Sequence, residues 1–129
     1  MDYIFLLGRI LFGGFFVMSG VGHFMNLQGM AGYAASKKVP MPKFSVGFSG
    51  LLLLLGGLGV LLGVYVQYTL ALLVIFLVPT TFMMHAYWMD TDPGMKMGNR
   101  VNFYKNLALL GAVLIMYMIP APWAFSLMK

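Results

Sequence analysis

Five polar residues stand within or beside otherwise apolar segments: Arg9, His23, His85, Lys105 and Asn106. An ionisable side chain at the centre of a membrane costs at least about 2.5–3.5 kcal/mol, so its presence in an apolar segment suggests a function. Imidazole, ammonium and amide groups bind oxygen atoms through hydrogen bonds. These five residues are therefore candidates for binding a quinone-like or anionic head group.

The elements that carry these residues must lie in lipid. Of 129 residues, 61% are hydrophobic and 9% are charged, and the mean hydropathy is +0.90. Soluble domains average about 45–50% apolar and about 25% charged residues, and a chain of this size cannot hide so much apolar surface from water. The composition excludes a soluble globular protein. The absence of cysteine excludes disulfides, thiolate iron–sulfur clusters and cysteine-ligated zinc.

Four apolar segments approach the roughly 20 residues that cross a bilayer core about 30 Å thick. They cover residues 3–25, 44–64, 67–88 and 102–119. The link between the second and third segments is short, so these two must run antiparallel. We expect an all-α fold: an integral membrane, antiparallel four-helix bundle with up-down-up-down topology. Residues 1–129 would form this single domain.

The loop between the first two spans is expected to hold a short helix. Residues 28–38 place Met30, Tyr33 and Ala34 at the helical spacing i, i+3, i+4. This spacing, with lysines beside it, is typical of a helix that lies in the membrane interface. Pro40 ends the helix, and the link up to Pro42 leads stiffly into the second span.

The charge distribution predicts the orientation of the chain. The net charge is +5, from eight basic and three acidic residues. Loops 26–43 and 89–101, together with the start of the fourth span, hold six of the eight: Lys37, Lys38, Lys43, Lys96, Arg100 and Lys105. By the positive-inside rule both loops are cytoplasmic and both termini lie outside. The charge therefore gives no reason to expect a nucleic-acid partner.

This topology brings four candidates from three helices to one membrane depth. His23 and His85 lie near the inner ends of the first and third spans, and Lys105 and Asn106 near the start of the fourth. Arg9 lies about 9 Å along the first span at 1.5 Å per residue, so it can reach the outer surface by snorkelling. No span contains a carboxylate, so a buried cation must use carbonyls, lipid phosphate, a partner subunit or an anionic or quinone-like ligand.

Each candidate also has a structural interpretation. His23 and Lys105 can anchor to lipid head groups, and His85 can belong to an aromatic belt with Tyr87 and Trp88. Asn106 can bridge two helices through its amide.

Two other residue types are interpreted as packing. Thirteen methionines suggest Cu(I) transport, but no repeated Met-x-x-Met stripe follows any span, so we favour gap filling and expect no metal site. Gly59 and Gly63 form a small-xxx-small pair, for which contact within the bundle is favoured over dimerisation.

Six short motifs, in chain order over about residues 6–112, resemble the DoxX-like family of small four-helix membrane proteins. They are LGR at 7–9, SGVGHF at 19–24, AASKKVP at 34–40, LLGG at 54–57, FMMHAYW at 82–88 and NFYKNLAL at 102–109. The resemblance implies an integral protein of the prokaryotic inner membrane. The family takes its name from a membrane subunit of a thiosulfate:quinone oxidoreductase, and other members are associated with oxidative-stress or detoxification complexes.

One position departs from the family pattern. The family often carries a glutamate at the start of the motif that ends in Gly-Gly on the second span, where this chain has Leu53. If that carboxylate takes part in quinone or proton chemistry, this chain lacks that part.

The resemblance and the polar residues together favour a membrane subunit of a redox complex with a quinone-head pocket near the cytoplasmic face. His23 or His85 would hydrogen-bond a quinone carbonyl, and Lys105 or Asn106 would stabilise the reduced oxygen. The sequence shows no redox centre and no intrinsic cofactor, so electrons would come from a soluble partner or a bound cofactor. No residue pattern identifies catalysis by the chain alone.

The alternative is a non-catalytic membrane scaffold or assembly subunit that recruits a partner through Lys37, Lys38, Lys96 and Arg100. Haem b held between the two histidines is a less favoured interpretation. Small-molecule transport would require a homo-oligomer, because a bundle of four helices leaves little room for a pore.

Overall fold

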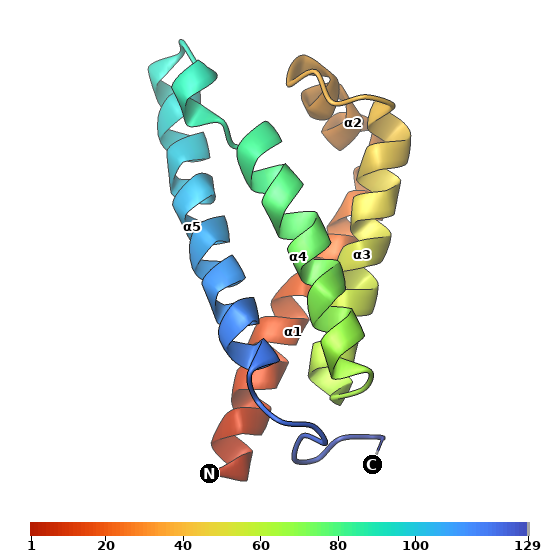
Figure 1. The fold of residues 1–129 in the computed structure, drawn as a ribbon. Helices are drawn as coiled ribbons and strands as arrows, with labels where there is room; N and C mark the ends of the chain where they lie inside the picture. The colour runs from red at the N-terminus through yellow and green to blue at the C-terminus, as the bar shows by residue number, and fades with distance from the viewer. Residues whose placement is uncertain (129) are drawn as a thin grey trace.

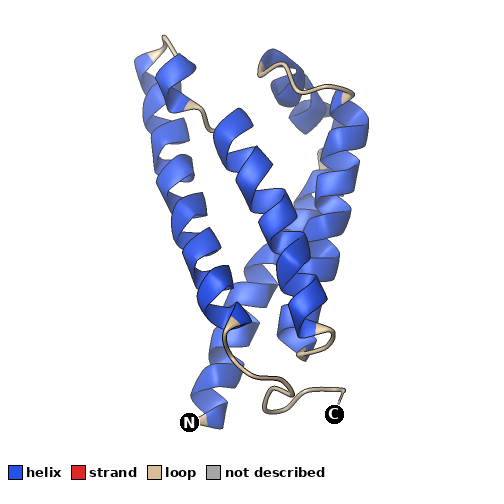
Figure 2. Cartoon of the chain, in the orientation of Figure 1, coloured by secondary structure: helices blue, strands red, loops and turns tan. Residues whose placement is uncertain are grey.

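The computed structural model describes residues 1–128, which form helices joined by short links and contain no β-strand (Figures 1 and 2). The all-α prediction is confirmed. The helices are α1 (Asp2–Met25), α2 (Leu27–Ser36), α3 (Pro42–Leu62), α4 (Val66–Met83), the short 3-10 helix η1 (Tyr87–Met89) and α5 (Pro93–Tyr117).

Three stretches among the described residues are long and apolar enough to cross a membrane: α1, α3, and residues Val66–Met89 from α4 through η1. Helix α5 has 25 residues but is not among the three. Its N-terminal half carries Lys96, Arg100 and Lys105, which lower its hydropathy. The fourth predicted span is therefore a long helix with a polar first half.

In the first half of the chain, the helices agree closely with the segments predicted from the sequence. Helices α1 and α3 lie within two residues of the first two predicted spans, and α2 occupies the place of the predicted short helix. Helix α3 begins with Pro42 in its first turn, where proline is well tolerated because its missing N–H would be unpaired anyway.

The third predicted span, residues 67–88, agrees with the membrane-length stretch Val66–Met89 but is not one continuous helix. Helix α4 ends at Met83 rather than near residue 88, and η1 follows after a three-residue link, 84–86. The aromatic rings of Tyr87 and Trp88 pack edge-on against Phe103 of α5, with centroids 5.5 Å apart in both pairs. This contact turns the chain toward α5, and the apolar pattern of the segment alone does not show it.

The predicted loop 89–101 is wrong for residues 93–101, which belong to α5. Asp92 caps the helix, because its side chain accepts a hydrogen bond from the backbone N–H of Met95 at 2.8 Å. Pro93 stands at the first helical position. An acidic cap followed by proline is a known way to begin a helix, and here it outweighs the turn tendency of the Asp-Pro-Gly sequence.

Helix α3 is the centre of the fold and contacts α1, α2 and α4, whereas α5 packs against α4 and η1. Figure 1 shows α3 and α4 diverging toward the end that carries α2 and η1, with both chain termini at the other end. The main apolar core lies where the helices stay close: Phe16, Leu53, Val60, Val66, Leu70, Leu73, Leu77, Val113 and Trp123. The diverging end holds the candidate site.

Candidate ligand-binding site

A cavity of about 550 Å³ lies among α1, α2, α3, α4 and α5 at the end where α3 and α4 diverge. Small-molecule sites typically have volumes of about 300–1,000 Å³ and mostly apolar walls. Aromatic side chains form much of this wall: Phe15, Phe16, Phe44, Phe48 and Phe76. The cavity therefore has the size and lining of a site for a flat apolar ring.

Four of the five candidate residues line this cavity: His23, His85, Lys105 and Asn106. They come from α1, from the link after α4, and from α5. The sequence predicted this convergence, and the structure has it. That the residues bind a ligand stays a prediction.

His23 lies in the last turn of α1 and is 9% exposed. Its Nδ1 lies 2.8 Å from the backbone carbonyl oxygen of Ser19, and its ring stands edge-on to Phe76 with centroids 6.1 Å apart. A carbonyl oxygen only accepts hydrogen bonds, so Nδ1 carries the proton. In the neutral ring Nε2 is then a bare acceptor.

On α5, Lys105 and Asn106 differ in how firmly they are held. The Nζ atom of Lys105 donates to Asn102 at 3.4 Å and lies 5.6 Å from the centroid of the Phe15 ring, although the residue remains exposed. Asn106 is 4% exposed, and its side-chain amide forms no hydrogen bond with any described residue. Every wholly enclosed side-chain nitrogen or oxygen of the described chain has a partner. The Asn106 amide is therefore not wholly enclosed, and the open space beside it is the cavity.

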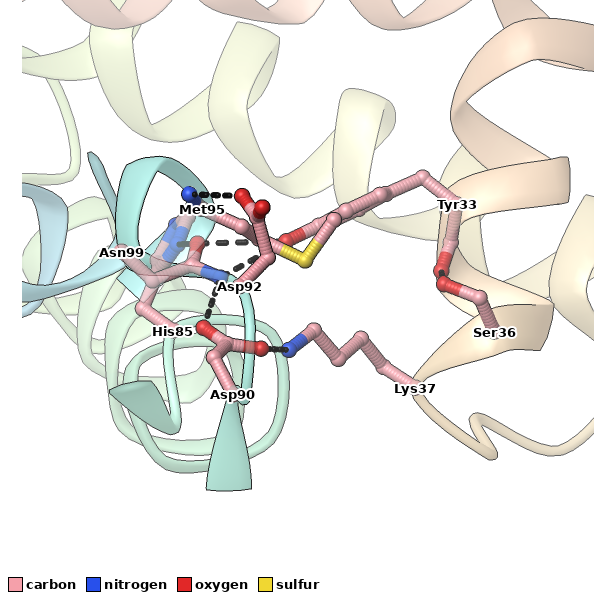
Figure 3. Close-up of polar contacts among 8 residues, drawn as sticks. All are labelled: Tyr33, Ser36, Lys37, His85, Asp90, Asp92, Met95 and Asn99. Atoms are coloured by element: carbon pink, nitrogen blue, oxygen red, sulfur yellow. Dashed lines mark hydrogen bonds and ion pairs between the residues drawn. The ribbon is translucent and has the colours of Figure 1, made fainter. Parts of the chain in front are cut away.

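At the end of the cavity that α2 covers, a hydrogen-bonded network joins α2 to α5 through Asn99 (Figure 3). The Asn99 amide nitrogen donates to Asp90 at 2.7 Å and to the Tyr33 hydroxyl at 2.9 Å. The Asn99 amide oxygen lies 3.2 Å from Tyr33 Oη, which donates to it, and 3.2 Å from His85 Nδ1. All four hydrogen-bonding positions of this amide are thus used.

Asp90 holds the other side of the network. Its second carboxylate oxygen lies 2.5 Å from the Nζ atom of Lys37, and the two side chains are 4% and 11% exposed. The hydrogen bond from Asn99, and then that from Lys37, lower the pKa of Asp90 below its ordinary value. The carboxylate is therefore ionised at neutral pH and holds Asn99 by accepting its N–H.

Tyr33, Asp90 and Asn99 belong to the network at this site, and the sequence does not single them out. In a predicted loop 89–101 the spacing of Asp90 and Asn99 carries no meaning. With α5 beginning at Pro93, Asn99, Asn102 and Asn106 have the spacing i, i+3, i+7 and share one helix face. The Asp92-Pro93 start signal, interpreted as a helix cap rather than a turn, would have revealed this face.

Arg9 lies outside the cavity, between the last turn of α3 and the C-terminal segment, and is 1% exposed. Its guanidinium donates to the carbonyl oxygens of Val60 at 3.0 Å, Leu61 at 2.8 Å and Ala124. The first two belong to the last turn of α3, whose carbonyls have no partner within the helix. Backbone carbonyls are therefore the groups that compensate the buried charge of Arg9. Through them Arg9 joins α1 and the C-terminal segment to the end of α3.

Leu53 is fully buried in the main apolar core and does not line the cavity. The position at which the family often carries a glutamate thus faces the packed interior in this chain. The carboxylate that reaches a candidate residue is instead Asp90, which is linked to His85 through Asn99.

Comparisons with known proteins identify a family. The DoxX family model matches residues 4–86, which is more than half of the chain. Inner membrane protein YphA of Escherichia coli (strain K12) is 29% identical over 124 residues, covering 96% of this chain and 87% of that protein. No solved structure gives a significant match. With its three membrane-length apolar helices, the chain is an integral membrane protein and belongs to the DoxX family.

Proposed function

We propose that this chain is an inner-membrane subunit of a quinone-linked redox complex, and that its cavity holds the quinone head group. The observation that supports this most is the meeting of His23, His85, Lys105 and Asn106 in one cavity with an aromatic wall. In this proposal α5 is the fourth span of an antiparallel four-helix arrangement, and the end with α2 and η1 faces the cytoplasm.

The chemistry of the cavity fits an aromatic ring with oxygen atoms at its edge. Phe15, Phe16 and Phe76 offer faces and edges to a flat ring. Lys105 and the Asn106 amide can donate hydrogen bonds to its oxygens. A negative charge that develops on an oxygen during reduction would be stabilised by the ammonium of Lys105.

The residues of this chain bind and orient the head group and exclude water from it, while electrons arrive from a partner protein or a cofactor that the partner carries. The role proposed for the chain is therefore that of a quinone-binding subunit. Catalysis by the isolated chain is not part of the proposal.

Binding of decylubiquinol, the reduced form of a quinone probe, to the full chain in lipid nanodiscs tests the proposal. We expect saturable binding to the wild type, and at least a tenfold loss of affinity when His23→Ala and His85→Ala are combined. An exposed residue at the opposite end, changed by Tyr68→Phe, supplies a control that should bind as the wild type does. Unchanged affinity in the double variant, with the fold retained, would contradict the proposal.

A second candidate function, recruitment of a partner protein, is favoured by one surface feature. Tyr87, Lys96, Arg100 and Tyr104 line an exposed groove along α5. Of the four basic residues first considered for recruitment, Lys37 is paired with Asp90, which leaves Lys38, Lys96 and Arg100. A scaffold should lose its co-purifying partner when Lys96→Gln and Arg100→Gln are combined and should keep it in the double histidine variant. A quinone-binding subunit should instead lose decylubiquinol binding, and only in the histidine variant.

A further inference from the structure

The two histidines of the cavity share a feature that constrains their ligand: each uses Nδ1 in a hydrogen bond to an oxygen that can only accept. For His23 the oxygen is the backbone carbonyl of Ser19, 2.8 Å away. The proton of the neutral ring therefore stays on Nδ1, and Nε2 has a free lone pair and no hydrogen.

For His85 the same conclusion depends on a chain of three contacts. The carboxylate of Asp90 can only accept hydrogen bonds while it is ionised, as its pairing with Lys37 ensures. It therefore fixes the nitrogen of the Asn99 amide toward itself at 2.7 Å, which turns the Asn99 oxygen toward His85 Nδ1 at 3.2 Å. That oxygen accepts, so the proton of His85 also stays on Nδ1.

His23 lines the cavity, and its Nε2 atom is the ring nitrogen left free for a ligand. It has no hydrogen-bond partner among the described residues, and every wholly enclosed side-chain nitrogen or oxygen there has one. Nε2 is therefore not wholly enclosed, and the open space that His23 lines is the cavity. His85 lines the same cavity, and its Nε2 likewise has no described partner.

An acceptor inside a largely apolar cavity needs a donor from the ligand, because a polar atom left unpaired there loses its hydration without compensation. The oxygen of a quinone has no hydrogen, so it faces the lone pair of a neutral imidazole unfavourably. The hydroxyl of a hydroquinone donates, and its oxygen still accepts. Lys105 and Asn106 can therefore donate to both forms, and only the histidines distinguish them.

We infer that the cavity binds the hydroquinone form of its ligand in preference to the quinone form, with His23 Nε2 accepting the hydrogen of a ring hydroxyl. The inference rests on the proposed function, because it takes the ligand of the cavity to be a quinone or quinol. It reverses the expectation that a neutral histidine hydrogen-bonds a quinone carbonyl. In this arrangement Asp90 and Asn99 are positioning residues, since they act on the ligand only through His85.

The test compares the two redox forms of one probe on the full chain in nanodiscs at pH 8, where an ordinary imidazole is neutral. We expect decylubiquinol to bind at least about tenfold more tightly than decylubiquinone, which corresponds to 1.4 kcal/mol. His23→Gln should lower the ratio, and His23→Gln combined with His85→Gln should bring it close to one, because the amide of glutamine can turn to donate or to accept. Lys105→Met, the matched control, should weaken both forms by a similar factor and leave the ratio unchanged.

The possible outcomes separate the inference from the proposed function. Equal binding of the two forms, or tighter binding of the quinone, overturns the inference and leaves the quinone site standing. Absence of binding by either form overturns both. If His23→Gln does not fold, His85→Gln tests the same point, and a ratio that survives substitution of the histidine also overturns the inference.

Discussion

The ammonium of Lys37 and the carboxylate of Asp90 lie 2.5 Å apart and join the C-terminal end of α2 to the residue that follows η1. The two positions are 53 residues apart in the chain. Through Asn99 the pair also reaches His85, as Figure 3 shows. A surface ion pair contributes little to stability, but this one is nearly enclosed and sets the orientation of an amide and an imidazole.

Removing the ammonium should destabilise the fold and loosen this end of the cavity. Lys37→Met keeps most of the apolar stem but leaves the carboxylate of Asp90 nearly enclosed without its opposite charge, which is costly. We expect the melting temperature in detergent to fall by several degrees. Lys38→Met removes a neighbouring but exposed ammonium and should melt close to the wild type; equal effects of the two substitutions would show that the ion pair contributes nothing.

The network should weaken in acid. The pKa of Asp90 is lowered in the folded chain, first by the hydrogen bond from Asn99 and then by that from Lys37. A lowered folded-state pKa means that the contribution to stability is fully present above the ordinary aspartate value of about 3.9 and is lost as the pH falls through the folded-state pKa. The difference in melting temperature between the wild type and Asp90→Asn should therefore be constant from pH 7 to pH 5 and shrink toward pH 3.

Asp92→Asn is the matched control for this pH profile. Asparagine caps a helix about as well as aspartate, so the variant should keep the acid-induced loss that Asp90→Asn removes. The chain has only three acidic side chains, so few other groups can produce the same profile. A loss of stability that persists in Asp90→Asn would assign the acid sensitivity to another group.

The sequence predicted the helices of the first half and the convergence of four site residues because both follow from local periodicity. Apolar length placed α1 and α3, and the up-down order expected of the spans put His23, His85 and Lys105 at one end. The network around Asn99 was not predicted, because it requires the true start of α5. The carbonyl partners of Arg9 could not be predicted, because Arg9 and Val60 are 51 residues apart and only their packing determines the contact.

Close contact between α1 and α3 should depend on Gly13. A Cβ atom at this position would lie 2.7 Å from the carbonyl oxygen of Gly57 and 2.9 Å from the backbone nitrogen of Leu61. Because backbone atoms cannot move aside, Gly13→Ala must push the two helices apart, at a cost of about 1–3 kcal/mol. Unfolding in mixed detergent measures the change.

The neighbouring glycine gives the control. A Cβ at Gly14 meets nothing within 4 Å, so Gly14→Ala should be neutral, or more stable by up to about 1 kcal/mol because alanine favours the helix. A destabilisation of the same size at both positions would indicate a general cost of alanine in α1 rather than a tight contact with α3.

Arg9 should matter for stability and not for ligand binding. A lysine carries the same charge but lacks the planar fork with which Arg9 reaches carbonyls of Val60, Leu61 and Ala124. Arg9→Lys leaves at least one of these carbonyls without its partner, which costs about 1–3 kcal/mol. The affinity of the folded variant for decylubiquinol should equal that of the wild type, and a selective loss of affinity with normal melting would return Arg9 to the binding site.

The most direct test of a quinone site in this cavity is photoaffinity labelling of the full chain in nanodiscs with an azidoquinone, followed by mass spectrometry of the labelled peptides. Labels should concentrate on cavity-lining residues of α1 around His23 and of α4 around Phe76, and excess decylubiquinol should compete them away. Labels spread evenly over exposed apolar residues such as Leu11 and Ile115, without competition, would mean that the quinone partitions into lipid and that this cavity is not its site.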